Sequence, residues 1–171
     1  MIVGPSGSGK GTLINALQTA FPDKFAFSVS YTTRGIRTNE VDGIHYNFVT
    51  KDTFETMKAK DEFLETAAVH GNYYGTAKVG ITKIQEKQKI PLLDIDVQGA
   101  VNFVKYFPNA NCIFLASPSL QHMRDRLQKR GTETDETIET RLKNAVGEVD
   151  YLLGWKEKIN YRIFNDDLET S

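Results

Sequence analysis

The chain has 171 residues, a length that suits one compact domain with a substantial buried core. Hydrophobic residues make up 40% and charged residues 25% of it, and the formal net charge is −1, so no global basic field points to nucleic acid or to an anionic membrane as a partner. The single cysteine, Cys112, excludes an internal disulfide framework. Because it lies in the apolar run 112–116, we expect a buried thiol in a reducing compartment.

The first residues read as a short apolar strand, a glycine-rich loop and a helix over 10–20. Glycines let successive backbone N–H groups face an anion, the helix N-terminus adds partial positive charge, and the lysine adds a full one. A flexible Gly/Ser-rich turn is the alternative, but it does not explain a lysine placed between loop and helix. The pattern therefore predicts a phosphate-binding loop (P-loop) for a nucleotide. Its residues are Gly4, Pro5, Ser6, Gly7, Ser8, Gly9, Lys10, Gly11 and Thr12.

One position departs from this loop pattern. A hydroxyl normally follows the lysine and helps to hold magnesium, but here Gly11 stands there and the nearest hydroxyl is on Thr12. The prediction of a metal site is therefore weaker than the prediction of a phosphate site.

Residues 30–76 form a strand-rich insertion after a predicted strand over 25–29. The insertion reads, in order, as a polar stretch over 30–43, a strand over 45–49, a helix over 51–60 capped by Thr50 or Asp52, and a strand over 63–69 that ends at a turn over 70–72.

Helices and strands alternate in the rest of the chain. Helices are predicted over 78–88, 97–107, 119–130 and 136–155, and strands over 90–96, 111–117 and 159–164, with a polar break over 131–135. Short, continuously apolar strands between helices predict a parallel sheet covered on both faces. The strand over 90–96 carries Asp94, which in a P-loop protein holds magnesium directly or through water, and Asp96 should project on the same side.

Both ends of the chain are expected to be cut. Only three residues precede the loop, and residues 165–171 resemble a helix start without its body.

Two groups of arginines have both a functional and an ordinary interpretation. Arg34 and Arg37 are either a fork for a second phosphate or exposed residues of a solvated turn. Arg126 and Arg130 share one helix face, and Arg141 follows the polar break; all three either serve a phosphate or form salt bridges with Glu133, Asp135 or Glu136.

With these residues in view, the chain resembles the guanylate kinases. The stretches that carry the resemblance are GPSGSGKGTL (4–13), FSVSYTTRGIR (27–37), EVDGIHYNFV (40–49), EFLETAAVHGNYYGT (62–76), LLDIDVQGA (92–100), RLQKRGTET (126–134) and NDDL (165–168). They follow the family's order over most of the chain.

The resemblance implies an α/β P-loop nucleoside monophosphate kinase fold in a single domain. It implies a five-stranded parallel core sheet covered by helices (1–29, 77–121 and 146–171), a small mixed-sheet GMP-binding insertion (30–76) and a helical lid (122–145). The implied reaction is phosphoryl transfer from ATP to GMP with Mg²⁺ and without a covalent intermediate. A cytoplasmic role in purine nucleotide metabolism is implied as well, with no nucleic-acid or membrane partner.

The resemblance also assigns site residues. It implies catalytic roles for Lys10, Arg34, Arg130 and Arg141, and an aspartate, Asp94, that holds the metal through water. ATP would be bound by the loop residues 4–12 together with Arg126, Arg130, Asn165 and Asp166. GMP would be bound by Ser30, Arg34, Arg37, Tyr46, Glu65, Tyr74, Gly75, Thr76, Asp94, Asp96, Gln98 and Gly99. Carboxylates suit the N1 and N2 donors of guanine, and hydroxyls suit its O6 edge.

Two other functions stay open on the sequence. A guanylate-kinase-like module that binds peptides would normally have a degraded P-loop, whereas Lys10 and the loop glycines are intact here. The second open function is that of a kinase for another nucleoside monophosphate. Tyr31 replaces a small residue beside Ser30 and is expected to alter the fit around the base.

Overall fold

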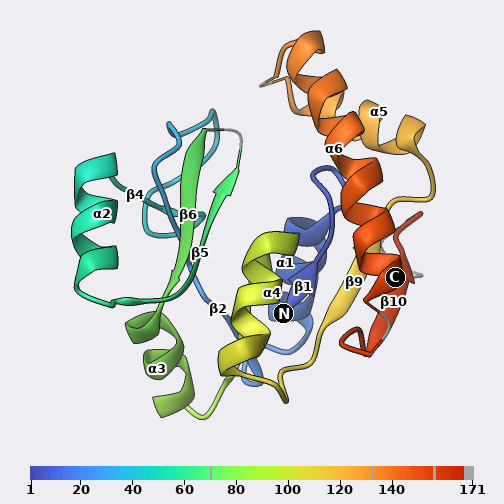
Figure 1. Cartoon of the computed structure of the whole chain (residues 1–171). Coiled ribbons are helices and arrows are strands. Elements are labelled where there is room, and N and C mark those ends of the chain that lie inside the picture. The colour runs from blue at the N-terminus through green and yellow to red at the C-terminus, as the bar shows by residue number, and fades with distance from the viewer. Residues whose placement is uncertain (70, 132, 156, 168–171) are drawn as a thin grey trace. The chain divides into compact units, whose positions relative to one another are not determined.

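The protein is described by a computed structural model that covers residues 1–69, 71–131, 133–155 and 157–167 (Figure 1). The chain divides into two compact units. Unit 1 comprises Met1–Ala16, Asp94–Val97 and Ala110–Ser171, and unit 2 comprises Leu17–Leu93 and Gln98–Asn109.

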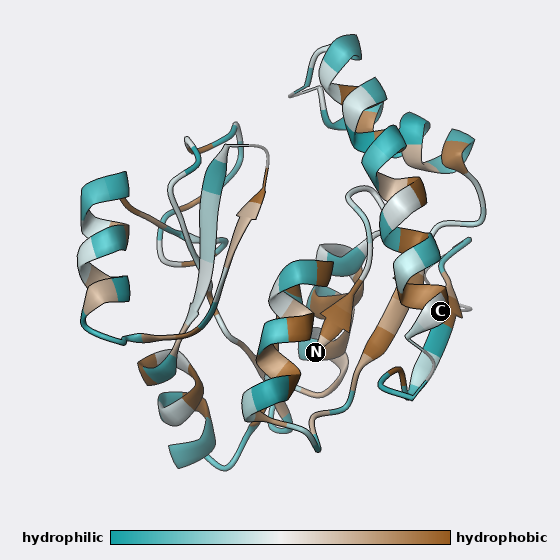
Figure 2. Cartoon of the chain, in the orientation of Figure 1, coloured by the Kyte–Doolittle hydropathy of each residue, from teal (hydrophilic) through white to brown (hydrophobic). Residues whose placement is uncertain are grey.

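Unit 1 is built on a four-stranded parallel sheet. Its strands, in spatial order, are β10 (Tyr161–Phe164), β9 (Ile113–Ala116), β1 (Ile2–Val3) and β8 (Asp94–Ile95). Figure 2 shows β1 and β9 in the brown of apolar residues, as expected for central strands of a parallel sheet. Ile2 is paired with Asp94 on one side and with Ile113 on the other. The loop that follows β1 therefore starts between the carboxyl ends of β8 and β9.

Two helices of unit 1, α5 (Leu120–Arg130) and α6 (Asp135–Gly154), pack against each other (Figure 1). Ser119 caps α5 by accepting from the His122 amide, and Thr134 caps α6 by accepting from the Thr137 amide. Gly131 ends α5 with φ 64°. One apolar cluster joins the two helices: Met123, Leu127, Ile138, Leu142 and Ala145.

Unit 2 contains a mixed sheet in the order β4 (Asn47–Phe48), β3 (Tyr31–Thr32), β6 (Asn72–Ala77) and β5 (Phe63–Val69). Strand β3 is parallel to β4 and antiparallel to β6, and β5 and β6 form an antiparallel pair. Helix α2 (Lys51–Ala59), capped by Thr50, places Phe54 against Phe63 and Tyr73 of this sheet, with ring centroids 4.6 and 5.5 Å apart. The insertion thus has its own aromatic core.

Gly75 shows how tightly this aromatic core is packed. A Cβ at Gly75 would lie 2.8 Å from the Phe63 ring and 3.1 Å from the Phe54 ring. We expect Gly75→Ala to lower the free energy of unfolding by about 1–3 kcal/mol, the usual cost of overpacking a core. Gly147→Ala, on α6 where a Cβ meets nothing within 4 Å, should raise that free energy slightly. Urea unfolding of both variants checks the pair, and an unchanged midpoint for Gly75→Ala would contradict the packing argument.

The rest of unit 2 comprises a parallel strand pair, β2 (Phe25–Phe27) with β7 (Ile90–Leu92), helix α3 (Lys78–Glu86) and helix α4 (Val97–Tyr106).

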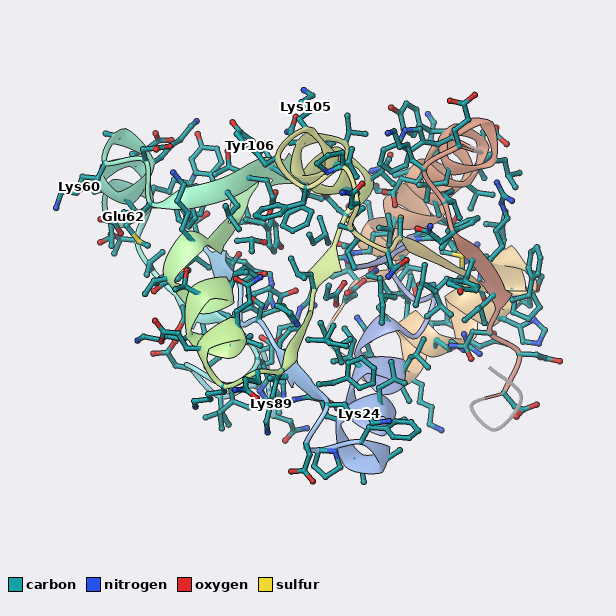
Figure 3. All side chains as sticks on the ribbon, turned by 90° about the horizontal axis from the view of Figure 1, so that it is seen from below. Lys24, Lys60, Glu62, Lys89, Lys105 and Tyr106 are labelled. Atoms are coloured by element: carbon teal, nitrogen blue, oxygen red, sulfur yellow. The ribbon has the colours of Figure 1, made fainter. Side chains whose placement is uncertain are left out.

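Lysines occupy the C-terminal ends of two helices of unit 2, where their charge complements the helix dipole. Lys60 follows α2, and Lys105 lies in the last turn of α4; both point away from the ribbon in Figure 3.

The predicted helices and the α/β class are confirmed, but the strands differ in detail. The predicted strand over 90–96 is divided at Leu93 into β7 and β8, which belong to different sheets. A single five-stranded sheet is therefore not confirmed. The short strands β3 and β6 are not predicted by the sequence patterns. The helix start expected over 165–171 lies partly outside the described residues, as do position 70 of the predicted turn, position 132 of the polar break and position 168 of the last motif.

Cys112 is fully buried, as predicted, and burial raises the pKa of its thiol. Among the described residues, no helix has the length and apolar character needed to cross a membrane.

Candidate active site

The loop after β1 folds as a phosphate-binding loop because its glycines adopt conformations closed to other residues. Gly9 has φ 95°, and a Cβ there would lie 2.2 Å from Asn165 Nδ2. A Cβ at Gly4 would lie 2.1 Å from the carbonyl oxygen of Leu115 in β9. Close packing against β9 and Asn165 thus fixes the loop from both sides.

Lys10, the first residue of α1 (Lys10–Ala20), reaches back across this loop. Its Nζ donates to the carbonyl oxygens of Gly4 at 2.7 Å and Pro5 at 3.2 Å, and it lies 3.7 Å from Asp94 Oδ1. The sequence prediction that Lys10 and Asp94 belong to one site is therefore matched by their distance. Both side chains are partly exposed, with 14% and 24% of their surface accessible.

Asn165 and Arg126 join the loop to the end of β10. Asn165 Nδ2 donates to the carbonyl oxygen of Ser8 at 2.7 Å. Arg126 Nη2 donates to the carbonyl oxygens of Asn165 at 2.8 Å and Asp166 at 3.0 Å. Residues predicted to bind ATP thus lie together, but the contacts of Arg126 go to backbone carbonyls. Arg130 is exposed at the end of α5.

Arg141 on α6 also reaches the loop. Its Nη1 donates to Ser6 Oγ at 2.7 Å, and its Nε lies 2.9 Å from Glu133 Oε2. The prediction that Arg141 serves the phosphate site is consistent with this position. The salt bridge with Glu133, which was the alternative to a phosphate-binding role, is present as well. A salt bridge and a place at the phosphate site are therefore compatible for Arg141.

Glu148 is a charged residue near this site that sequence analysis missed. It lies seven residues after Arg141, two turns further along the same face of α6. Burial raises the pKa of Glu148; the positive charges of Lys10 and Arg141 oppose this rise, and the negative charge of Asp96 adds to it. The sequence could have indicated it, because Glu148 lies three residues after Ala145 and four before Leu152, on the buried face of α6.

In unit 2, Arg34 is held by Glu40 in a two-pronged ion pair. Nη1 and Nη2 donate to the two carboxylate oxygens of Glu40, each at 2.8 Å, and Nη1 also donates to the Gly35 carbonyl oxygen at 2.7 Å. A guanidinium has five N–H groups in fixed directions. The Nε–H and the second Nη2–H, which are parallel, have no hydrogen-bond partner among the described residues. Arg34 thus presents one remaining fork of the kind that binds phosphate oxygens.

Tyr46 and Tyr74 lie near Arg34, and the backbone of Arg37 shares its partner Glu40. The Arg34 guanidinium lies 5.3 Å from the centre of the Tyr46 ring, and the Tyr46 and Tyr74 rings are 6.1 Å apart, edge to face. The backbone N–H of Arg37 donates to Glu40 Oε2 at 2.8 Å. Three of the predicted phosphate ligands of unit 2, Arg34, Tyr46 and Tyr74, are therefore near one another, and Arg37 is joined to them through its backbone.

Glu40 lies in the motif over 40–49, but sequence analysis gave it no role. Burial alone would raise the pKa of Glu40, but hydrogen bonds from the Arg34 side chain and the Arg37 amide outweigh burial and hold that pKa below its usual value. The same ion pair raises the pKa of Arg34 against the opposing effect of burial. Both groups are therefore ionised at neutral pH.

Glu65 and Thr76 form a buried polar pair in unit 2, where Ser30 is buried as well. They are cross-strand partners of β5 and β6, and the Thr76 hydroxyl donates to Glu65 Oε1 at 2.7 Å. Glu65 is 8% exposed, Thr76 1% and Ser30 7%. An ionised carboxylate at this depth requires hydrogen-bond donors. The pair therefore suits a ligand that offers N–H donors, as guanine does.

Tyr31 does not reach this pair. Its ring packs edge to face on Phe63, with centroids 5.8 Å apart, in the aromatic core of unit 2. Side chains alternate along a strand, so Tyr31 lies on the face opposite Ser30 and Thr32. Tyr31 thus belongs to the aromatic core, and its effect on the fit around the base stays a prediction. Gln98 and Gly99, the remaining predicted GMP ligands, lie in the first turn of α4, with Gln98 exposed and Gly99 buried.

If Arg34 holds the GMP phosphate, as the resemblance implies, Glu40→Gln should raise the KM for GMP roughly 10- to 100-fold, because a charge-assisted hydrogen bond contributes about 1.5–3 kcal/mol and this pair makes two. Steady-state kinetics with each substrate varied in turn measures the effect, and the KM for ATP should stay unchanged. Glu55→Gln, an exposed carboxylate on α2, is the matched control. Equal KM values for GMP in Glu40→Gln and the control would contradict the assignment.

The strand–loop–helix around Lys10, with Asp94 as the first residue of the neighbouring parallel strand β8, defines a P-loop nucleotide-binding protein. Comparison with known proteins identifies the family. The guanylate kinase family model matches residues 1–171. The guanylate kinase of Helicobacter pylori (strain ATCC 700392 / 26695) is 46% identical over 171 residues, which is the whole of this chain and 81% of the relative. That of Clostridium perfringens (strain SM101 / Type A) is 44% identical over 169 residues, 99% of this chain and 76% of the relative.

A solved structure agrees with these relatives. The crystal structure of guanylate kinase from Anaplasma phagocytophilum matches with a TM-score of 0.74 at 30% identity, over 98% of this chain and 76% of that one. The chain belongs to the guanylate kinase family, whose members transfer a phosphoryl group from ATP to GMP.

Proposed function

We propose that this chain transfers the γ-phosphoryl group of ATP to GMP, with ATP on the P-loop of unit 1 and GMP held by the insertion in unit 2. Membership of the guanylate kinase family makes it an ATP:GMP phosphotransferase. One observation supports the assignment of GMP to the insertion: unit 2 contains both the Arg34 guanidinium, with two N–H groups left for a phosphate, and the buried Glu65–Thr76 pair. A phosphate site and a site for N–H donors in one small sheet suit a purine monophosphate.

For the ATP half, we assign the backbone amides of residues 4–12 to the phosphates. Lys10 exchanges its carbonyl partners, Gly4 and Pro5, for phosphate oxygens, which are charged and therefore stronger acceptors. Arg130 and Arg141 neutralise charge on the transferring group, and Arg126, Asn165 and Asp166 border the nucleotide. The transition state spreads charge over the equatorial oxygens, so positioned cations suffice and no protein nucleophile is required.

For the GMP half, we assign the phosphate to Arg34, Arg37, Tyr46 and Tyr74. The base is assigned to Ser30, Glu65, Thr76 and Asp96, with Gly75, Asp94, Gln98 and Gly99 as further GMP contacts. An adenine ring would present an acceptor at N1 where guanine has a donor, and it would leave the buried Glu65 carboxylate without that partner. Discrimination thus follows from the cost of an unpaired buried charge.

Magnesium is the proposed metal. Mg²⁺ sites commonly use one or two carboxylates together with water and substrate phosphates. Asp94, partly exposed beside Lys10, fits a ligand that acts through water, and Gly11 supplies no hydroxyl. When bound, the metal would neutralise phosphate charge and orient the triphosphate.

The division into core (1–29, 77–121 and 146–171), GMP-binding insertion (30–76) and lid (122–145) is likewise a proposal, as is a cytoplasmic location. All of the insertion falls in unit 2 and all of the lid in unit 1, which is compatible with that division. The buried free thiol of Cys112 is compatible with the reducing cytoplasm.

An acceptor panel tests the function directly. ADP formation from ATP is measured with GMP, dGMP, AMP, CMP and UMP as acceptors, and GMP should give the highest kcat/KM. Dominant turnover of AMP or UMP would contradict the guanine assignment. Failure to bind either ATP or GMP in calorimetry would instead favour a peptide-binding module.

A further inference from the structure

The contact between Glu133 and Arg141 is the most deeply buried ion pair described in unit 1. The Glu133 side chain is 2% exposed and the Arg141 side chain 14%. Oε2 and Nε lie 2.9 Å apart but are not aligned as a hydrogen bond, so the attraction between them is chiefly that of opposite charges. A carboxylate buried to this extent is costly without a cation or hydrogen-bond donors beside it, and Arg141 is the cation in contact with it. Glu133 is therefore tied to the position of Arg141.

The local fold explains why these two residues meet. Gly131 turns the chain out of α5, and Thr134 caps α6, so Glu133 lies in the short connection just before the helix starts. Arg141 lies nearly two turns into α6, on the side of that helix from which its Nη1 reaches Ser6. The apolar cluster between α5 and α6 keeps both elements in place. One end of the guanidinium thus faces the connection and the other faces the P-loop.

We propose that Glu133 is a positioning residue for phosphoryl transfer, because it holds Arg141 by the Nε side and so aims Nη1 at the P-loop. The inference rests on the proposed function, which places Arg141 on the transferring phosphoryl group. A free arginine side chain has many rotamers, and a cation must already be oriented to stabilise the transition state effectively. Glu133 supplies that orientation before the nucleotide binds.

This role differs from a general electrostatic one. Burial raises the pKa of Glu148 and Arg141 also acts to lower it, but Glu148 lies two turns further along α6. The Glu133 carboxylate, by contrast, is in contact with the guanidinium. If the contact matters, removing the charge of Glu133 should alter the same step that loss of Arg141 alters, and it should not alter the binding of GMP.

The test is a double-mutant cycle on the full chain, with Glu133→Gln, Arg141→Ala and both together, read as kcat and as KM for each substrate. Glu133→Gln should lower kcat roughly 10- to 100-fold, the scale of loss when a reacting group is held about 1 Å out of place. The KM for GMP should not change, and the double variant should be no slower than Arg141→Ala alone. Glu136→Gln, an exposed carboxylate at the start of α6, is the matched control.

A structural role alone would give a different pattern. Glu133→Asp keeps the charge on a shorter side chain and should recover part of the kcat lost in Glu133→Gln, with thermal unfolding confirming that each variant is folded. If the wild type is active and Glu133→Gln has an unchanged kcat, the positioning role of Glu133 is wrong, while the proposed function stands. The same conclusion follows if the losses of the two single variants add in the double variant. Absence of GMP turnover by the wild type overturns the proposed function instead.

Discussion

Replacing Lys10 by alanine should lower kcat roughly 10³-fold, the upper range for removing one group that stabilises transition-state charge. Lys10 is the cation placed across the P-loop, and in this structure its Nζ is held by two loop carbonyls and lies close to Asp94. Alanine leaves the loop glycines and their backbone amides in place, so part of the ATP binding should remain. The loss should therefore appear mainly in kcat rather than in the KM for ATP.

The measurement is steady-state ADP release at saturating GMP, with circular dichroism to confirm the fold. Lys58→Ala removes an exposed lysine from the last turn of α2 and should keep full activity. A Lys10→Ala variant with kcat within a few-fold of wild type would remove Lys10 from the catalytic set.

Glu65→Gln should reduce kcat/KM for GMP roughly 100-fold, because a buried donor of the ligand loses a charged acceptor worth about 1.5–3 kcal/mol. Glutamine has the same shape and keeps a carbonyl oxygen for the Thr76 hydroxyl, so the pairing of β5 with β6 is preserved. The preference for GMP over AMP should shrink, because the carboxylate is the group that discriminates between their N1 positions.

The acceptor panel with GMP and AMP gives this ratio directly. Glu62→Gln, three residues earlier and exposed, is the control and should leave both values unchanged. If Glu65→Gln lowered turnover of GMP and AMP by the same factor, Glu65 would support the fold of the insertion and not the choice of base.

The helices were predictable because their signals are local. Thr50, Ser119 and Thr134 cap the helices that follow them, and apolar residues recur at helical spacing on α5 and α6. Strand β3 was not predictable, because Tyr31–Thr32 is only two residues long and becomes a strand by pairing with the distant β6. Strand β6 pairs with β5 directly before it, but Asn72 and Gly75 are poor strand formers and hide it in the sequence. The strand over 90–96 appears continuous in sequence but pairs with β2 in its first half and with β1 in its second.

The same distinction holds for the candidate site. The P-loop is contiguous, so its residues were predictable from spacing alone, and Asp94 followed from its place at the end of an apolar strand. Glu40 and Glu148 were not assigned roles, because the arginine or lysine near each of them is identified only by the fold. Glu133 was expected only as one of three salt-bridge partners, and the fold selects it for Arg141. Tyr31 was placed near the base because it is adjacent to Ser30 in sequence, but side chains alternate along a strand and the Tyr31 ring packs on Phe63.

The contact of Asn165 with the P-loop has a consequence for the order of folding. Asn165 donates to Ser8 across 157 positions of the chain, and β1 pairs on both sides with strands that come long after it in the sequence. Contacts of such sequence separation form slowly, since a long loop must close before they are made. The P-loop is therefore synthesised before almost all of its partners and acquires its final shape only when β10 has docked. During refolding, the ability to bind ATP should appear late and should report completion of unit 1.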